Sequence, residues 1–266
     1  MWRSSWAALV ACSLTACAIA PGPVSMSSSG SPPLVLQRGQ HAQVIDGAGP
    51  GGAPIRFWLY APDAAVGNAA PDAATKVPAD ALRWPLLIFL HGSGERGDDL
   101  ARVKVHGPPK RADVRGDLPF IIASPQLPQD RAWNADWVMP LLDKLLRELP
   151  IDPDRVYLTG LSLGGFGTWD VAAAHAGRFA AIAPVCGWGE VAQACALRNL
   201  PVWAFHGADD TVVAPEAGRA MVDAVVACGG KARFTLYPGV GHDAWNPAYA
   251  DPALYDWLLQ QRRPAP

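Results

Sequence analysis

The stretch Tyr157-Leu-Thr-Gly-Leu-Ser162-Leu-Gly-Gly-Phe-Gly167 decides how the centre of this chain folds. The apolar run at residues 155–159 predicts a strand, and residues 168–174 have the composition of a helix. A strand that enters a helix through Gly-x-Ser-x-Gly holds the serine in a strained turn, where only glycine fits beside it. This turn raises the hydroxyl above the sheet edge, and the helix directs its first N–H groups toward any negative charge that forms there. Ser162 is therefore a candidate nucleophile.

The composition of the whole chain limits the classes of protein to which it can belong. Its 266 residues suit a single large α/β domain. Half of the residues are hydrophobic and 17% are charged, which provides a substantial core and excludes global disorder. The net charge of −2 and the lack of a basic run argue against nucleic acid and favour a small or neutral substrate. No cysteine or histidine cluster has metal-site spacing, so we expect no metal and no other cofactor.

Residues 1–16 are predicted to be a signal peptide of the lipoprotein type. One positive charge precedes a mostly apolar segment, residues 4–14, that is too short to span a membrane. The segment ends in Leu14-Thr-Ala-Cys17, which resembles the lipobox of bacterial lipoproteins and predicts that Cys17 is lipidated as the new N-terminus. We therefore expect an exported protein, lipid-anchored on the periplasmic side of a bacterial membrane, with a periplasmic or secreted protein as the alternative.

Two other processing sites remain open. A cut after Ala20 has the look of ordinary secretion but is disfavoured by Pro21, and a lipobox ending at Cys12 leaves almost no apolar segment. Residues 17–34 are rich in Ser, Gly and Pro and predict a flexible tether. Three cysteines follow, an odd number that permits one internal bridge, and a bridge between Cys186 and Cys195 would close a short loop.

The rest of the chain, residues 35–266, predicts one α/β domain. Two alternating segments, 40–45 and 54–60, flank a glycine-rich turn and predict an antiparallel hairpin. Continuous apolar runs such as 85–90 and 119–123 predict strands buried on both faces. Further strands are expected at 179–185, 201–205 and 232–237, helices at 136–149, 215–228 and 251–262, and a long surface loop at 61–83. Buried strands alternating with helices predict a mostly parallel sheet with helices on both faces and functional residues at the C-terminal ends of its strands.

A nucleophilic serine needs a base, and the base needs a third group that fixes its tautomer. His242 follows the last predicted strand and precedes the terminal helix, which makes it the candidate base. Asp209 and Asp210 follow the strand before it, and composition alone leaves them equal as the acid. The other histidines are expected on the surface, in packing or in turns: His41, His91, His106, His175 and His206.

An oxyanion also needs backbone N–H donors. Leu163, the residue after the serine, is expected to supply one, and the glycine-rich loop at residues 91–97 is expected to supply the other. Three tryptophans near predicted strand ends, Trp133, Trp188 and Trp245, are candidates for a substrate pocket, although each could be an ordinary packing residue.

In combination, four motifs resemble a serine esterase of the α/β-hydrolase superfamily, close to the carboxylesterase, dienelactone-hydrolase and prolyl-oligopeptidase-like ("predicted peptidase") group. These motifs lie at residues 90–100, 160–169, 205–213 and 239–245. The resemblance implies that Asp210 is the acid and that the backbone N–H of Ser93 is the second oxyanion donor. Two departures are Leu163, where methionine is usual, and Ala214-Pro215, which replaces an earlier proline.

The resemblance implies an activity without a cofactor. Ser162, activated by His242 and Asp210, would attack the carbonyl of a small or oligomeric ester, and water would release the acyl group. A serine peptidase of the same fold is the alternative, and a non-catalytic binding protein is a remoter one. The ester substrate and the oligomeric state are not fixed by the sequence.

Overall fold

A computed structural model describes residues 32–66, 83–116 and 118–264. The predicted signal peptide, Cys17 and most of the predicted tether lie outside the described residues, as do residues 67–82 of the expected surface loop. Among the helices of the described ranges, none combines the length and apolar character that a membrane crossing requires.

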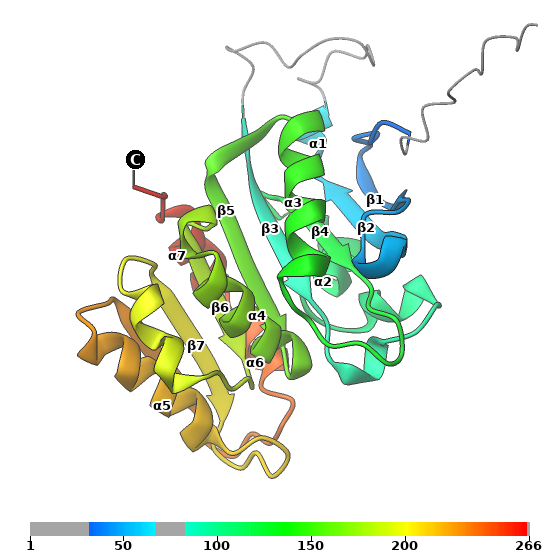
Figure 1. The fold of residues 1–266 in the computed structure, drawn as a ribbon. Helices are drawn as coiled ribbons and strands as arrows, with labels where there is room; N and C mark the ends of the chain where they lie inside the picture. The colour runs from blue at the N-terminus through cyan, green and yellow to red at the C-terminus, as the bar shows by residue number, and fades with distance from the viewer. Residues whose placement is uncertain (1–31, 67–82, 117, 265–266) are drawn as a thin grey trace, which may run out of the picture. The chain divides into compact units, whose positions relative to one another are not determined.

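The centre of the domain is an eight-stranded sheet with the strand order β1-β2-β4-β3-β5-β6-β7-β8 (Figure 1). β2 pairs antiparallel with β1 and with β4, and every other neighbouring pair is parallel. The strands are β1 (Gly39–Ile45), β2 (Ile55–Ala61), β3 (Trp84–Leu90), β4 (Ile121–Pro125), β5 (Ile151–Leu161), β6 (Ala181–Val185), β7 (Val202–Gly207) and β8 (Ala232–Tyr237). The predicted mostly parallel sheet, opened by an antiparallel hairpin, is confirmed.

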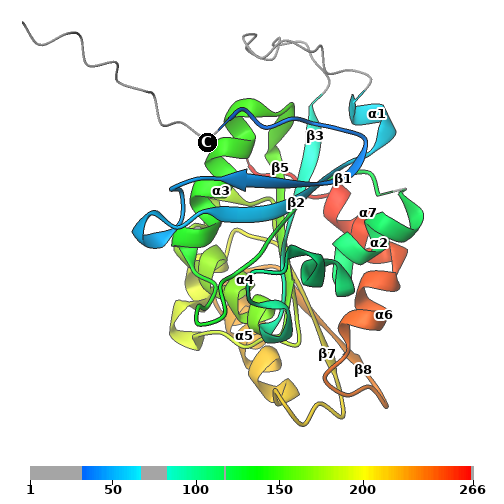
Figure 2. The ribbon, with the colours of Figure 1, turned by 90° about the vertical axis from the view of Figure 1, so that its right-hand side faces the viewer.

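Helices cover both faces of this sheet. Figure 2 shows α3, α4 and α5 on one side and α2, α6 and α7 on the other. The α-helices are α1 (Asp63–Val66), α2 (Gly107–Arg115), α3 (Ala135–Glu148), α4 (Leu163–Ala174), α5 (Pro215–Ala227), α6 (Trp245–Ala250) and α7 (Pro252–Leu259). Short 3-10 turns are η1 (Pro50–Gly52), η2 (Ser93–Glu95), η3 (Leu100–Val105), η4 (Ala176–Arg178) and η5 (Val191–Leu197).

Two hydrophobic cores, one on each face, hold the sheet between the helices. Side chains alternate between the faces along β3, because successive residues of a strand point to opposite sides. Leu86, Ile88 and Leu90 pack into the core that α3, α4 and α5 cover. Leu87 and Phe89 pack into the core that α2, α6 and α7 cover. Burial on both faces explains why the sequence of β3 is continuously apolar.

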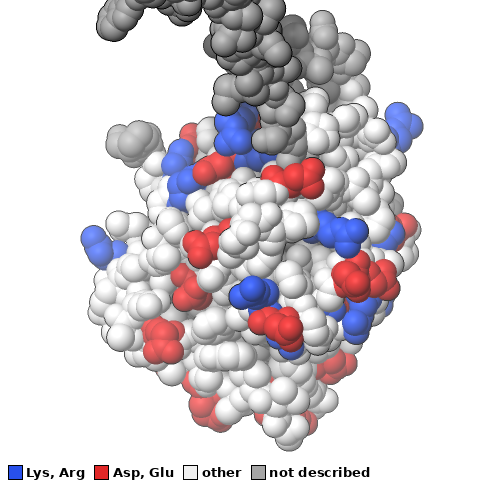
Figure 3. All heavy atoms as spheres, turned by 45° about the vertical axis from the view of Figure 1, so that its right-hand side comes forward, with Lys and Arg blue, Asp and Glu red and all other residues white. Residues whose placement is uncertain are grey.

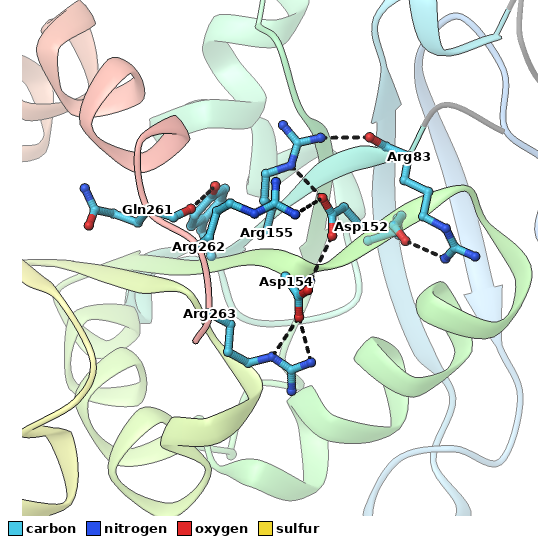
Figure 4. A network of polar contacts seen from close by, with 9 residues as sticks. Arg83, Asp152, Asp154, Arg155, Gln261, Arg262 and Arg263 are labelled. Carbon is cyan, nitrogen blue, oxygen red and sulfur yellow. Dashed lines mark hydrogen bonds and ion pairs between the residues drawn. The ribbon is translucent and has the colours of Figure 1, made fainter. Parts of the chain in front are cut away.

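The C-terminal segment with Arg262 and Arg263 is bound to the N-terminal end of β5 (Figure 4). The carboxylate of Asp152 lies 2.9 Å from Nε of Arg155 and 3.1 Å from an Nη atom of Arg262. Asp154 pairs with Arg263 at 2.9 Å. Because parallel strands share a direction, their C-terminal ends, where functional residues are expected, lie at one end of the sheet. This network lies at the other end.

One disulfide joins Cys195 on η5 to Cys228 at the end of α5. The bridge considered between Cys186 and Cys195 is therefore not the one in the structure. Cys186 is buried directly after β6 as a free thiol, and the packing of α5 against η5 brings Cys228 to Cys195 instead. The two cysteines are 33 residues apart, so the sequence alone does not indicate that they pair.

Candidate active site

The turn between β5 and α4 holds Ser162 in a strained conformation. Its φ of 52° and ψ of −116° lie outside the ordinary helix and strand regions. The flanking glycines are required by close approach, because a Cβ on Gly160 would lie 2.3 Å from the carbonyl oxygen of Gly164. A Cβ on Gly164 would in turn lie 1.9 Å from the carbonyl oxygen of Leu90. Packing of α4 onto the sheet thus fixes where the serine hydroxyl lies.

Three predicted side chains meet above the C-terminal ends of the strands. Nε2 of His242, in the loop after β8, lies 2.9 Å from Oγ of Ser162. Nδ1 of the same ring lies 2.8 Å from Oδ2 of Asp210, in the loop after β7. Asp210 is buried, whereas Asp209 points to solvent. The structure therefore brings Asp210, and not Asp209, to the histidine.

The carboxylate of Asp210 is held by donors on both oxygens. Oδ1 accepts the backbone N–H groups of Val212 and Val213, each at 2.9 Å. Burial raises the pKa of Asp210, but the hydrogen bonds from His242, Val213 and Val212 outweigh burial, so its pKa lies below the usual value. Asp210 is therefore ionised at neutral pH and oriented toward His242.

Ser93 and Leu163 line the same cavity as Ser162. Leu163 is the first residue of α4, so its N–H has no acceptor within the helix. Ser93 begins η2, and Nε of Arg96 donates to its carbonyl oxygen at 3.2 Å. Arg102 reaches the carbonyl oxygens of Gly94 and Arg96 from η3. These contacts fasten the loop whose N–H groups were predicted to bind an oxyanion.

His91 is buried beneath this loop and has a role that its sequence position does not reveal. Its Nε2 accepts the N–H of Leu127 at 3.0 Å, so Nδ1 carries the proton and donates to the carbonyl oxygen of Gly92 at 2.7 Å. Burial lowers the pKa of His91 to about 4, which keeps the ring neutral. The carbonyl of Gly92 belongs to the same peptide group as the N–H of Ser93. The ring thus fixes the plane of the peptide that presents this donor.

A cavity of about 620 Å³ opens beside the serine. Its lining consists of Ser93, Ser162, Leu163, Trp188, Gly189, Val191, Val212, Val213, Ala217 and Ala220. Among the three predicted tryptophans, Trp188 lies in this lining and stacks on Phe166, with ring centroids 5.1 Å apart. Trp245 begins α6 and meets the His242 ring edge-on at 5.3 Å, outside the lining.

Trp133 is not a pocket residue, contrary to the sequence-based expectation. Its side chain is 1% exposed, and its Nε1 donates to the carbonyl oxygen of His91 at 2.9 Å. The ring also packs edge-on against the His91 imidazole at 5.0 Å. The backbone of α4 comes close to this side chain at Gly167, where a Cβ would lie 2.3 Å from the Cβ of Trp133.

Cys186, His206 and Asp210 place ligand-type atoms within 4.8 Å of one another, but their chemistry does not fit a metal ion. Burial raises the pKa of the Cys186 thiol to about 12, so it stays protonated. Nε2 of His206 lies 3.0 Å from the carbonyl oxygen of Val213, to which it donates. The carboxylate already accepts hydrogen bonds on both oxygens.

Comparisons with known proteins agree with this fold. Residues 136–253 match the profile of the Dienelactone hydrolase family, and this segment contains Ser162, Asp210 and His242. The bifunctional acetylxylan esterase/xylanase XynS20E of Neocallimastix patriciarum is 30% identical over 136 residues, 48% of this chain and 20% of that protein. Carboxylesterase SOBER1 of Arabidopsis thaliana is 27% identical over 136 residues, 49% of this chain and 59% of that protein.

Among solved structures, the crystal structure of a thermostable esterase is 30% identical, with a TM-score of 0.71 over 84% of this chain and 63% of that one. The chain therefore spans less than two thirds of the length of each of these relatives. The sheet topology and the family match lead to one assignment. The chain has the α/β-hydrolase fold, and its residues 136–253 match the dienelactone hydrolase family.

Proposed function

We propose that the chain hydrolyses carboxylic esters through an acyl-enzyme formed on Ser162. The observation that carries this proposal is the continuous hydrogen-bonded series from Oγ of Ser162 through the His242 ring to Oδ2 of Asp210, at 2.9 and 2.8 Å. A serine hydroxyl attacks only when a base accepts its proton, and this series supplies the base together with its orienting carboxylate. The esterase names of the relatives support the same chemistry.

In the proposed mechanism, Nε2 of His242 takes the hydroxyl proton as Oγ of Ser162 attacks the ester carbonyl. The N–H groups of Leu163 and Ser93 stabilise the oxyanion that forms. His242 then gives its proton to the departing alcohol, and a water molecule activated by the same ring releases the acid. The charge of Asp210 stabilises the protonated ring during both steps. The rigid loop around Ser93 lowers the reorganisation that oxyanion binding requires.

The experiment that tests this proposal combines hydrolysis with labelling. Ser162→Ala is expected to abolish the hydrolysis of p-nitrophenyl acetate and to remove covalent labelling by a fluorophosphonate probe. Near wild-type turnover in Ser162→Ala would refute the assignment. A wild-type protein that neither reacts with the probe nor turns over any ester would instead support the binding-protein alternative.

A serine peptidase of the same fold would use the same side chains on an amide bond. Because esters are the more reactive acyl compounds, the proposal favours esters, and parallel assays of a p-nitrophenyl ester and the matched p-nitroanilide compare the two activities. The net charge of −2 suits an uncharged small or oligomeric ester better than a polyanion. The face drawn in Figure 3 carries acidic and basic side chains interspersed.

Export and lipidation at Cys17 are also proposals, supported by the Leu-Thr-Ala-Cys sequence at the end of a short apolar segment. Mass spectrometry of the mature N-terminal peptide is the test. A diacylglyceryl-modified Cys17 is expected, and an unmodified peptide that begins elsewhere contradicts the anchor.

A further inference from the structure

The cavity beside Ser162 is apolar although it adjoins a polar reaction centre. None of its lining side chains is ionisable, and their polar groups are the hydroxyls of Ser93 and Ser162 and the indole N–H of Trp188. Val191 and Val212 form part of its wall and are 50% and 70% exposed, respectively. Exposed apolar side chains that converge on a cavity mark a surface that a ligand covers.

The position of the cavity decides which half of an ester it can accept. The carbonyl oxygen must point toward the proposed N–H donors of Ser93 and Leu163, and both residues line the cavity. The departing alcohol must lie near Nε2 of His242 to receive its proton. His242 lies outside the lining. The cavity therefore extends from the acyl side of the carbonyl carbon, away from the alcohol.

Trp188 provides a rigid face for this cavity. Its ring stacks on Phe166 of α4 with an interplanar angle of 30°, which restricts how the indole turns. The next residue, Gly189, also lines the cavity. A Cβ added to Gly189 would lie 3.0 Å from side-chain atoms of both Met221 and Trp169, so the core directly adjoins this part of the lining. Ala217 on α5 lines the same space. A flat aromatic wall and small opposing side chains suit a planar or flexible apolar group.

We propose that this cavity is an acyl pocket for uncharged apolar acyl groups larger than acetyl, with Trp188 as its stacking face and Ala217 as a residue that sets its depth. The inference rests on the proposed ester hydrolysis and specifies its substrate class. Acyl groups that carry a carboxylate or an ammonium group are excluded, because the lining offers no partner for a buried charge. The volume of about 620 Å³ lies within the range of sites that enclose whole organic ligands.

The test uses p-nitrophenyl esters, so that the alcohol is the same throughout. The wild-type kcat/KM is expected to rise from acetate to hexanoate by about two- to fourfold per buried methylene. Benzoate is expected to be a good substrate, and the anionic hemisuccinate to be at least about tenfold poorer than the neutral pentanoate of similar length. Equal kcat/KM values for acetate, hexanoate and hemisuccinate would overturn the inference.

Substitutions at two lining residues test whether the cavity causes the dependence of kcat/KM on the acyl group. Ala217→Leu is expected to lower the ratio of hexanoate to acetate kcat/KM by about tenfold or more, because its side chain fills the space. Trp188→Ala is expected to lower the ratio of benzoate to acetate by about fivefold, and Trp188→Phe to restore most of it, because a ring is again present. Ala227→Leu, on an exposed position of α5 outside the lining, is the matched control and keeps both ratios.

A second series of acetate esters varies the alcohol from methyl to hexyl. If Ala217→Leu changes the selectivity of this series and not that of the acyl series, the cavity binds the alcohol and the inference is wrong. If the protein turns over acetates but neither variant changes any ratio, the acyl pocket fails while ester hydrolysis stands. If no ester is hydrolysed and Ser162 is not labelled, the proposed function fails and the acyl pocket with it.

Discussion

Nε2 of His206 lies 3.1 Å from Oδ2 of Asp210, the oxygen that also accepts the hydrogen bond from His242. The same nitrogen lies 3.0 Å from the carbonyl oxygen of Val213, so Nε2 carries a proton that both acceptors share. Nδ1 of His206 faces Gly218 on α5 and has no hydrogen-bond partner among the described residues. Burial lowers the pKa of His206 and favours this neutral form. Asp210 is thus held between two histidines.

This relationship predicts that His206 positions the carboxylate. His206→Phe removes the donor and is expected to lower kcat by about tenfold, since one charge-assisted hydrogen bond is lost. His206→Gln, whose amide also donates, is expected to recover most of the rate. The measurement is kcat on p-nitrophenyl acetate across pH.

A merely structural role for His206 would lower the Tm of its variants and leave kcat of the folded protein unchanged. In His206→Phe, Asp210 loses one of the donors that orient its carboxylate toward His242. The loss is therefore expected in kcat rather than in KM, and His206→Gln is expected to restore it. A folded His206→Phe variant with the kcat of the wild type contradicts the positioning role.

The two neighbouring aspartates give a sharp comparison. Asp210→Asn is expected to lower kcat by about 10³- to 10⁴-fold, because an amide neither carries the charge nor fixes the tautomer of His242. Asp209→Asn, which changes an exposed side chain, is expected to stay within about twofold of the wild type. Steady-state kinetics on one ester measures both, and a larger loss in Asp209→Asn would reverse the assignment of the acid.

The buried neutral ring of His91 predicts a pH dependence of stability. Its pKa is about 4 in the folded chain and about 6.5 in the unfolded chain. Between these values only the unfolded state binds the proton, so stability is fully present above pH 6.5 and falls as the pH drops toward 4. The contribution over this window is about 3 kcal/mol, and about 2 kcal/mol between pH 7.5 and 5.

Urea unfolding of the wild type and His91→Gln at pH 7.5 and 5 measures this contribution. The variant is expected to be less stable at pH 7.5, because a glutamine amide does not reproduce the geometry with which the ring accepts from Leu127 and donates to Gly92. Its free energy of unfolding is nevertheless expected to change by about 2 kcal/mol less between the two pH values. Parallel pH dependences in the two proteins would show that the ring is not held neutral.

The ion pairs of Asp152 and Asp154 lie at the N-terminal ends of the strands, away from the candidate active site (Figure 4). A substitution there is therefore expected to change stability and not activity. Burial raises the pKa of Asp152, but the N–H of Asp154 and the guanidinium groups of Arg155 and Arg262 outweigh burial and lower it. Asp152→Asn is expected to cost about 1–3 kcal/mol of unfolding free energy and to leave kcat unchanged. Asp154→Asn, which changes a more exposed ion pair, is the control and is expected to cost less. A fall in kcat in folded Asp152→Asn would contradict the separation.

Patterns of neighbouring residues were enough to predict the parts of the site that depend on local backbone structure. The turn at Ser162 and the strand ends that carry His242 and Asp210 follow from glycine spacing and apolar runs. The start of α4 does not, because the glycines at 164, 165 and 167 look like a loop. They lie within a helix because it packs directly on neighbouring backbone, and tertiary contact then overrides helix propensity.

Side-chain direction and distant pairings are the parts that the sequence could not supply. β5 begins at Ile151, in a segment with Pro153 that resembles a turn, because Ile151 pairs with Trp84 of β3. The predicted terminal helix at 251–262 corresponds to α7, which Asp251 caps and which ends at Leu259. The short helix α6 before it was not predicted. Trp133 and Trp188 both follow strands, and their positions in the sequence do not show that Trp133 is buried against His91 while Trp188 lines the cavity.

The effect of dithiothreitol on Tm distinguishes a bridge between Cys195 and Cys228 from a bridge that involves Cys186. A bridge between Cys195 and Cys228, 33 residues apart, restricts the unfolded chain and is expected to stabilise the fold by about 2–4 kcal/mol. Dithiothreitol is therefore expected to lower the Tm of the wild type and of Cys186→Ala. It is expected to leave the Tm of the double variant Cys195→Ser/Cys228→Ser unchanged, already at the reduced value. If Cys186→Ala instead abolished the sensitivity to dithiothreitol, the bridge would involve Cys186, and the packing of α5 against η5 would have to differ.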